Sequence, residues 1–241
     1  MEINTAAWTF NPALNSYCKA APMICRRRHV SLAALNGFVY AVGGTDSEPS
    51  IPSVERYNTV SNQWVLVKAI ETELTTPAVA ASLQGKLFVA GVTDLGDNET
   101  VGCIQCFDPD SDSWKTLSSS LPPLPYSSPC VFDGKLYLVG GWDLVKQESS
   151  PSVVCFDPKT STWNICRPME EGRVSPGVTV MANKMFVFGG SQNADDKTQA
   201  VDTMEVYDPG TDQWLGKTTM EVKRSWFGCT TLNIPLCMVF R

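Results

Sequence analysis

The chain has 241 residues, of which 43% are hydrophobic and 18% charged, with a formal net charge of −6. This composition supports a folded domain with a sizeable core and excludes a disordered chain. The acidic balance argues against a nucleic-acid partner, which requires a basic surface. No apolar run reaches the roughly 20 residues that span a bilayer, so we expect no membrane partner.

The first predicted elements are two short strands within residues 8–22, joined by the turn in FNPALNSY (10–17). A complete set of four strands follows. It begins with VSLAAL (30–35), turns at LNGF, and continues with FVYAVGG (38–44), which ends in a glycine pair. After the loop TDSEPSIPS (45–53), a third strand runs to Tyr57 and a fourth begins at Trp64.

This set of four strands recurs along the chain. Its most constant part ends in an aromatic residue and reads YNTVSNQW, FDPDSDSW, FDPKTSTW and YDPGTDQW. The tryptophans are spaced by 50, 49 and 51 residues, at Trp64, Trp114, Trp163 and Trp214. Glycine pairs close the second strand at Gly43 and Gly44, Gly140 and Gly141, and Gly189 and Gly190. A fixed period near 50 residues predicts a repeat architecture without helices.

Asp108, Asp110 and Asp112 stand at alternate positions, as in the opening of a calcium loop. A calcium loop also needs a glycine at its sixth position and an acidic residue at its twelfth, where this chain has Ser113 and Ser119. Asp-Pro is favourable chemistry for a type I turn. We therefore expect a tight turn and no metal.

The period, the Gly-Gly pair, the Tyr/Phe-Asp-Pro motif and the following tryptophan resemble the kelch repeat. The resemblance covers nearly the whole chain and implies an all-β fold, a kelch β-propeller of four-stranded blades in a single domain, 1–241. The approximate repeats are 1–22 (partial), 23–70, 71–120, 121–168, 169–220 and 221–241 (partial). The four tryptophans are expected to pack between neighbouring blades, and the glycines to permit close approach of the backbone.

The two ends of the chain carry half-repeats. Residues 8–22 match the last two strands of a blade, and residues 224–241 match the first two, without their glycines. Together they predict one split blade. The ring either closes with five blades or is a fragment of a six-bladed ring; the fragment is favoured because Met1 begins where a blade would be cut in half. In the kelch-like family the missing part would include an upstream BTB–BACK region that binds a cullin.

Function is expected on the loops at one rim, because strands form the scaffold. Aligning the segment that follows each outer strand gives one equivalent position per blade: Arg27, Leu74, Tyr126, Arg173 and Arg224. The resemblance implies that this rim grips acidic peptides, so the arginines are expected to form a positive patch suited to carboxylates or phosphates. Further partner-binding candidates are Arg28, His29, Ser127, Trp142, Ser175 and Trp226. The alternatives are arginines that only extend into solvent, and a Trp142 that folds back on its own blade.

Three functions remain open. The leading interpretation is a non-catalytic protein-interaction module, the substrate adaptor of a BTB-kelch protein in a cullin-based ubiquitin ligase complex. The alternative is a cytoskeletal, actin-associated scaffold. An enzyme is disfavoured because His29 is the single histidine, and we expect no cofactor. Cys103 and Cys106 form a CxxC motif on a strand, where they would point to opposite faces, which favours core thiols over zinc. Nine cysteines without a signal peptide predict a cytoplasmic protein.

Overall fold

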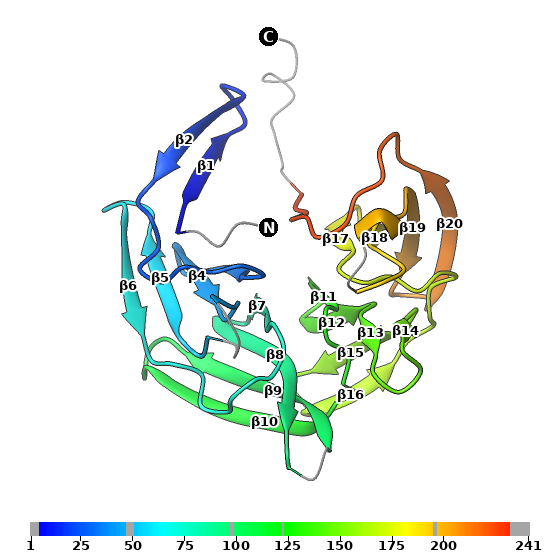
Figure 1. Cartoon of the computed structure of the whole chain (residues 1–241), viewed down its shortest axis with the longest axis horizontal. Coiled ribbons are helices and arrows are strands. Elements are labelled where there is room, and N and C mark those ends of the chain that lie inside the picture. The colour runs from blue at the N-terminus through cyan, green and yellow to red at the C-terminus, as the bar shows by residue number, and fades with distance from the viewer. Residues whose placement is uncertain (1–4, 47–50, 97–98, 122, 195–196, 232–241) are drawn as a thin grey trace.

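Four antiparallel sheets of four strands each surround a common axis in the computed structural model (Figure 1), which describes residues 5–46, 51–96, 99–121, 123–194 and 197–231. Within each sheet the four strands pair in chain order. Blade A contains β3 (Ser31–Leu35), β4 (Phe38–Val42), β5 (Val54–Asn58) and β6 (Gln63–Val67). Blade B contains β7 (Val79–Leu83), β8 (Lys86–Asp94), β9 (Thr100–Asp108) and β10 (Ser113–Leu121).

The second half of the chain repeats this arrangement. Blade C contains β11 (Ser128–Phe132), β12 (Lys135–Val139), β15 (Val153–Asp157) and β16 (Thr162–Ile165). Blade D contains β17 (Gly177–Met181), β18 (Lys184–Phe188), β19 (Thr203–Asp208) and β20 (Gln213–Thr219). A two-stranded sheet, the half-blade, contains β1 (Ala7–Asn11) and β2 (Ser16–Ala20). The kelch propeller inferred from the repeat is confirmed.

The hydrophobic core lies between blades. One buried cluster joins residues of blades A and B, a second joins B and C, and a third joins C and D. The second strand of a blade that has neighbours on both sides is therefore buried on both faces, as along Leu136–Val139 of β12, whereas β18 of blade D alternates between buried and half-buried residues. A strand covered on both faces needs a continuous apolar sequence, which is why these runs lack polar alternation.

The repeated tryptophans occupy equivalent surroundings. Each ring lies 4.9–5.0 Å from the aromatic ring at the end of the third strand of its own blade. Three indoles also donate a hydrogen bond to a carbonyl in the segment that follows the outer strand of the preceding blade. The pairs are Trp64 with Ala21 (2.9 Å), Trp114 with Lys68 (2.9 Å) and Trp214 with Arg167 (3.1 Å). The tryptophans therefore link consecutive blades, as expected.

The aspartates of the recurring turn are structural. Asp108 accepts a hydrogen bond from the amide of Asp110 at 3.0 Å and pairs with Lys86 at 2.8 Å. Asp157 and Asp208 accept equivalent bonds from the second residue after them. The predicted turn is confirmed, and its geometry is the same in copies without alternating aspartates.

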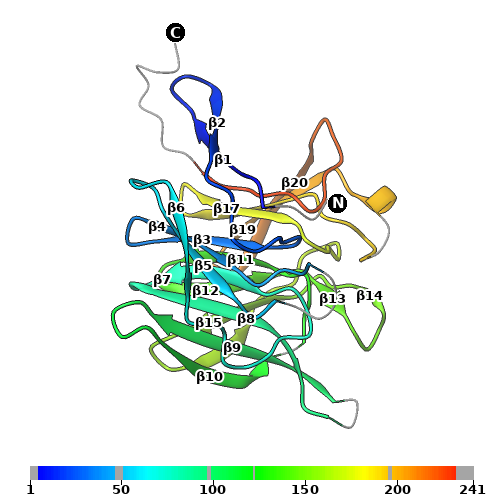
Figure 2. The same ribbon diagram turned by 60° about the vertical axis from the view of Figure 1, so that its left-hand side comes forward.

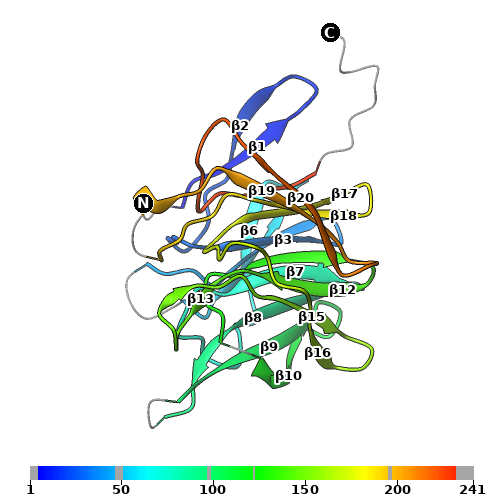
Figure 3. The ribbon, with the colours of Figure 1, turned by 90° about the vertical axis from the view of Figure 1, so that its right-hand side faces the viewer.

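Two loops are more ordered than the sequence predicted. The expected loop Thr93–Thr100 is shortened at both ends, because β8 continues to Asp94 and β9 begins at Thr100, which makes a long hairpin of two nine-residue strands. In blade C the loop contains a short hairpin, β13 (Trp142–Asp143) with β14 (Glu148–Ser149). Both hairpins project on the same side of the molecule (Figures 2 and 3).

The half-repeats at the two ends of the chain do not pair with each other in the described part of the structure. Within the described residues, β1 pairs only with β2, and residues 221–231 contain no strand. The predicted second strand of the split blade falls on residues 232–241, outside the described part of the chain. Among the residues described, no helix is long and apolar enough to cross a membrane.

Candidate functional site

One rim of the propeller is formed by two kinds of segment. The lead-in segments (21–30, 68–78, 123–127, 166–176 and 220–227) connect each outer strand to the next inner strand, and the loops follow each second strand. Paired backbone hydrogen bonds join the two kinds, between Arg28 and Thr45 and between Val174 and Ser191. The sequence correctly predicted that these segments lie together.

The same backbone bonds correct the predicted alignment in blade C. The amide of Trp142 bonds the carbonyl of Pro125, just as Thr45 bonds Arg28 and Ser191 bonds Val174. Leu124 therefore occupies the position of Arg27 and Arg173, and Tyr126 lies two residues further along. The prediction that Tyr126 is equivalent to the arginines is wrong, because the lead-in segment of blade C differs in sequence from the other copies.

Arg27 and Arg173 are buried, with exposed fractions of 3% and 0%. Arg27 pairs with Glu55 at 2.9 Å, and Arg173 pairs with Glu205 at 2.8 Å. Each guanidinium also donates to the carbonyl of the first glycine of the Gly-Gly pair, Gly43 or Gly189. These two arginines hold the second and third strands of their own blades together, so they do not belong to an exposed positive patch.

The two glutamates were missed in the sequence. Glu55 and Glu205 lie on the third strand, two residues before the aromatic residue, and each also accepts a backbone amide bond from the lead-in segment. A signal was available, because glutamate appears at this position in the two complete copies that carry the arginine. The equivalent positions hold Leu74 and Gln105 in blade B, and Leu124 and Val154 in blade C.

Glycines allow the chain to pass the lead-in segments closely. A Cβ atom at Gly189 would lie 2.3 Å from the carbonyl oxygen of Arg224, and one at Gly140 would lie 2.3 Å from that of Arg173. Both glycines have positive φ. Only glycine satisfies both restrictions, which explains the recurring pair.

Arg224 differs from the other two arginines. Its side chain is exposed, and no ion pair to it occurs among residues 5–46, 51–96, 99–121, 123–194 and 197–231. The third-strand position that holds Glu55 or Glu205 in other blades holds Trp8 in β1. Of the three equivalent arginines, Arg224 is the one with an exposed side chain and no ion pair in the described part of the chain.

Three ring side chains from different lead-in segments meet, and one of them belongs to Trp226, two residues after Arg224 in the chain. The Trp226 ring lies 4.7 Å from that of His29 and 5.2 Å from that of Tyr126. All three residues have positive φ, at 57°, 54° and 63°. Ser175, at the equivalent position of blade D, also has positive φ, at 46°, so this backbone conformation recurs with the repeat. We name His29, Tyr126 and Trp226 the axial cluster, because each directly precedes an innermost segment.

The other rim residues predicted from the sequence are half-buried or buried. Arg28 is half-buried and donates from Nε to the hydroxyl of Thr45 at 3.1 Å. Ser127 is buried, and Ser175 is half-buried and donates to the carbonyl of Tyr126. Trp142 is half-buried at the base of the β13–β14 hairpin. The structure thus brings Trp226, Tyr126 and His29 together, with Arg224 two residues before Trp226, and leaves Trp142 on a separate hairpin.

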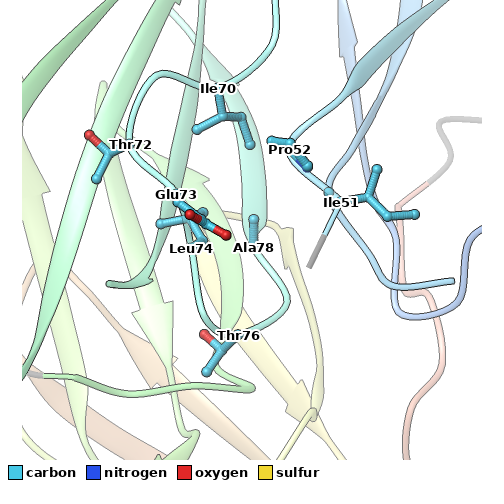
Figure 4. A pocket seen from close by; sticks show the side chains of 9 residues that line it. Ile51, Pro52, Ile70, Thr72, Glu73, Leu74, Thr76 and Ala78 are labelled. Carbon is cyan, nitrogen blue, oxygen red and sulfur yellow. The ribbon is translucent and has the colours of Figure 1, made fainter. Parts of the chain in front are cut away.

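A pocket lies between blades A and B (Figure 4). Ile51 and Pro52 line one wall, while Ile70, Leu74 and Ala78 line the other. Its charged group is the carboxylate of Glu73. This lining is apolar and acidic, so the pocket does not suit an anionic ligand, in contrast to the surroundings of Arg224.

Several buried thiols lie in the core rather than at the rim. Cys103 packs in the cluster between blades A and B, and Cys106 in the cluster between B and C. They therefore face opposite sides of β9, as predicted. Burial raises the pKa of both thiols. Within the described residues, no group of three metal-binding side chains is present.

Comparisons with known proteins agree with this architecture. Residues 32–234 match the model of the KLHDC2/KLHL20/DRC7 Kelch-repeats domain. The chain is 31% identical to mouse (Mus musculus) Kelch-like protein 35 over 93% of its length and 27% identical to Xenopus tropicalis Kelch-like protein 25 over 90%. It spans 37% of the length of each relative.

A solved structure of YjhT shares the fold, with a TM-score of 0.71, 16% identity, and coverage of 86% of this chain and 69% of that one. The family model covers most of the described chain, including all four blades. The protein therefore belongs to the KLHDC2/KLHL20/DRC7 kelch-repeat domain family, whose propellers are protein-interaction modules.

Proposed function

We propose that the rim around Arg224 and the axial cluster binds an acidic or phosphorylated segment of a protein partner, without catalysis. The contact of Trp226 with His29 and Tyr126 is the observation on which this proposal depends. Tryptophan, tyrosine and arginine are the side chains that most often dominate a protein interface. The guanidinium supplies a bidentate donor for a carboxylate or phosphate, and the rings supply apolar contact.

We further propose that the chain is the substrate-recognition propeller of a cytoplasmic kelch-like adaptor. Relatives named Kelch-like proteins, of which the chain spans 37%, support this assignment. In such an adaptor, the cullin would be bound by a BTB–BACK region and the target by the propeller. An actin-associated scaffold is the alternative outcome of the experiment below.

The test begins with capture of partners by the full-length protein. Recovery of a cullin supports the adaptor, whereas co-sedimentation with actin and no cullin supports the scaffold. A captured partner is then titrated with Arg224→Ala and Trp226→Ala. Each substitution should weaken binding by about 2 kcal/mol or more, as at an interface hot spot.

Lys223→Ala provides the matched control, because Lys223 is an exposed cation beside Arg224. Its loss should change affinity little if the site recognises the guanidinium specifically. Equal effects of Lys223→Ala and Arg224→Ala would indicate only general attraction to positive charge. Unchanged binding by both Arg224→Ala and Trp226→Ala would place the partner elsewhere.

A further inference from the structure

The lead-in segment of blade B departs from its counterparts where it meets the preceding blade. Between blades C and D, the amide of Gly141 donates to the carbonyl of Arg173 at 2.8 Å, and the same bond recurs after blade D. The corresponding bond between Gly44 and Leu74 is absent from the described part of the chain. The lead-in segment of blade B therefore lies less closely against blade A than its counterparts lie against their neighbours.

The first glycine of each pair gives independent evidence for this gap. A Cβ atom at Gly140 would lie 2.3 Å from the carbonyl oxygen of Arg173. One at Gly43 would have the Cβ atom of Ala78, at 3.3 Å, as its nearest neighbour. The space that this difference leaves is the pocket of Figure 4, which Gly43 and Ala78 line, and we name it the A–B pocket.

Thr76 lines the A–B pocket and lacks the contacts of its counterparts. It corresponds to Ser175, whose amide donates to the carbonyl of Tyr126 at 2.9 Å and whose carbonyl accepts from Trp226 at 3.4 Å. Among the residues described, Thr76 has neither bond, and it lacks the positive φ of these three residues. Its hydroxyl oxygen is buried there without a hydrogen-bond partner. Most buried hydroxyls are satisfied, so this one is available to a donor from outside the chain.

Glu73 supplies a carboxylate to the same pocket. Its side chain is exposed, and the ion pairs within residues 5–46, 51–96, 99–121, 123–194 and 197–231 do not include it. Glu71, two positions earlier, pairs with Lys68 at 3.4 Å. The counterparts of Glu73 in blades A and D are Arg26 and Gly172, so the carboxylate is a feature of blade B.

Backbone bonds hold both walls of the A–B pocket in place. The amide of Thr75 donates to the carbonyl of Val92 at 2.8 Å, which fixes the lead-in segment to its own blade. The amide of Ile70 donates to the carbonyl of Pro52 at 3.0 Å, which joins the two walls. A site formed before its ligand arrives costs less ordering entropy on binding.

We propose that the A–B pocket binds a basic side chain, lysine or arginine, of a protein partner. The aliphatic part of such a side chain would pack on Ile51 and Ile70, and its cationic end would donate to the Glu73 carboxylate and the Thr76 hydroxyl. Lysine and arginine offer donors and no acceptor, which matches two acceptors that lack partners. This inference rests on the proposed function in taking the partner to be a protein bound at this rim. It adds a second subsite, of opposite charge preference to Arg224.

The first experiment uses a lysine side-chain analogue and does not need the partner. The full chain, with labelled isoleucine methyl groups, is titrated with n-butylammonium and, separately, with neutral n-butanol. The methyl signals of Ile51 and Ile70 should shift with both, and n-butylammonium should bind about two- to fivefold more tightly, as an exposed charge pair allows. Glu73→Gln should abolish this preference. Glu71→Gln is the matched control and should retain it, because Glu71 is an exposed acid of the same segment outside the pocket lining.

Three results would contradict the proposal. Equal affinities of the parent protein for the two probes would show an apolar crevice without charge selection. Unshifted signals of Ile51 and Ile70 would exclude the pocket as a binding site. A preference lost equally in Glu71→Gln and Glu73→Gln would indicate only general attraction to the acidic chain.

The second experiment separates this inference from the proposed function. Random peptides are selected for binding to the parent protein, to Glu73→Gln and to Arg224→Ala. Peptides from the parent should be enriched in both acidic and basic residues, with the basic enrichment lost in Glu73→Gln and the acidic enrichment lost in Arg224→Ala. Basic enrichment that survives Glu73→Gln would overturn the second subsite alone, whereas acidic enrichment that survives Arg224→Ala would overturn the proposed function alone.

Discussion

The two positions that hold a buried Arg–Glu pair in blades A and D hold residues of different chemistry in blades B and C. Arg173 with Glu205 is fully ionic, Leu74 with Gln105 is neutral and polar, and Leu124 with Val154 is apolar. Each combination leaves no charge uncompensated inside the blade. This is the condition that a low-dielectric interior imposes, because isolated buried charges are strongly unfavourable.

A double-mutant cycle tests this pairing. Arg173→Leu alone leaves the Glu205 carboxylate buried without its partner, so we expect a loss of about 3–5 kcal/mol in the free energy of unfolding. Arg173→Leu with Glu205→Val copies the apolar pair of blade C and should recover most of that loss. Urea denaturation measures both variants, and a double variant less stable than the single one would contradict the interpretation.

Asp212 connects stability to pH. The hydroxyl of Tyr207 donates to its carboxylate at 2.6 Å, and the amide of Arg167 donates at 2.8 Å. These bonds lower the pKa of Asp212 below its ordinary value of 3.8. The stabilisation is therefore present above that value and is lost as the pH falls through the lower pKa of the folded state.

Blade A provides the control, because Asn62 makes the same contact with Tyr57 without titrating. Asp212→Asn should keep an oxygen acceptor and remain close to the parent in stability at pH 7. Below pH about 4 its melting temperature should fall less steeply than that of the parent protein. Parallel melting curves across this range would show that Asp212 does not contribute.

At the scale of the elements, each blade is joined to the preceding one through its fourth strand. The indole of Trp214 donates to the carbonyl of Arg167. In contrast, the Nε1 atom of Trp163 is buried without a hydrogen-bond partner in the described part of the chain. The recurring tryptophan therefore contributes apolar area in every blade and a hydrogen bond in only some of them.

This contrast predicts unequal effects of the same substitution. Trp214→Phe keeps an aromatic ring and removes the hydrogen bond, so it should destabilise the protein by about 1 kcal/mol more than Trp163→Phe does. Both substitutions lose the same ring area, so the difference between the two variants mainly reports the hydrogen bond. Chemical denaturation measures the free energy of unfolding of both variants. Equal decreases would show that the hydrogen bond of the indole makes no net contribution to stability.

The elements themselves were largely predictable. The Gly-Gly pair, the Asp-Pro turn and the tryptophan repeat four strands at a fixed spacing, and local chemistry determines each of them. The extension of β8 and β9 was not predictable, because nothing in Thr93–Thr100 alternates strongly enough to distinguish a long hairpin from a loop. Here pairing with the adjacent strand outweighs the weak local preference.

At the scale of the whole molecule, no blade contains its own core. Each of the three hydrophobic clusters draws its side chains from two neighbouring blades. A blade that unfolds therefore removes half of the core of its neighbour. This arrangement couples the blades more strongly than a simple sum of independent repeats would.

We therefore expect a single unfolding transition. Tryptophan fluorescence and far-ultraviolet circular dichroism should give coincident curves in urea, and Trp214→Phe should shift the entire transition rather than part of it. Two resolved steps, with only one of them sensitive to Trp214→Phe, would show that blade D unfolds independently.

The sequence by itself determined the repeat and the four-stranded blade, because both follow from local patterns with a fixed period. Only the tertiary structure decided which rim residues are available. Arg27, Arg173 and Arg224 look alike in sequence, yet two are neutralised by glutamates on a distant strand and one is not. Burial and ion pairing depend on residues about 30 positions away, so composition and spacing do not reveal them.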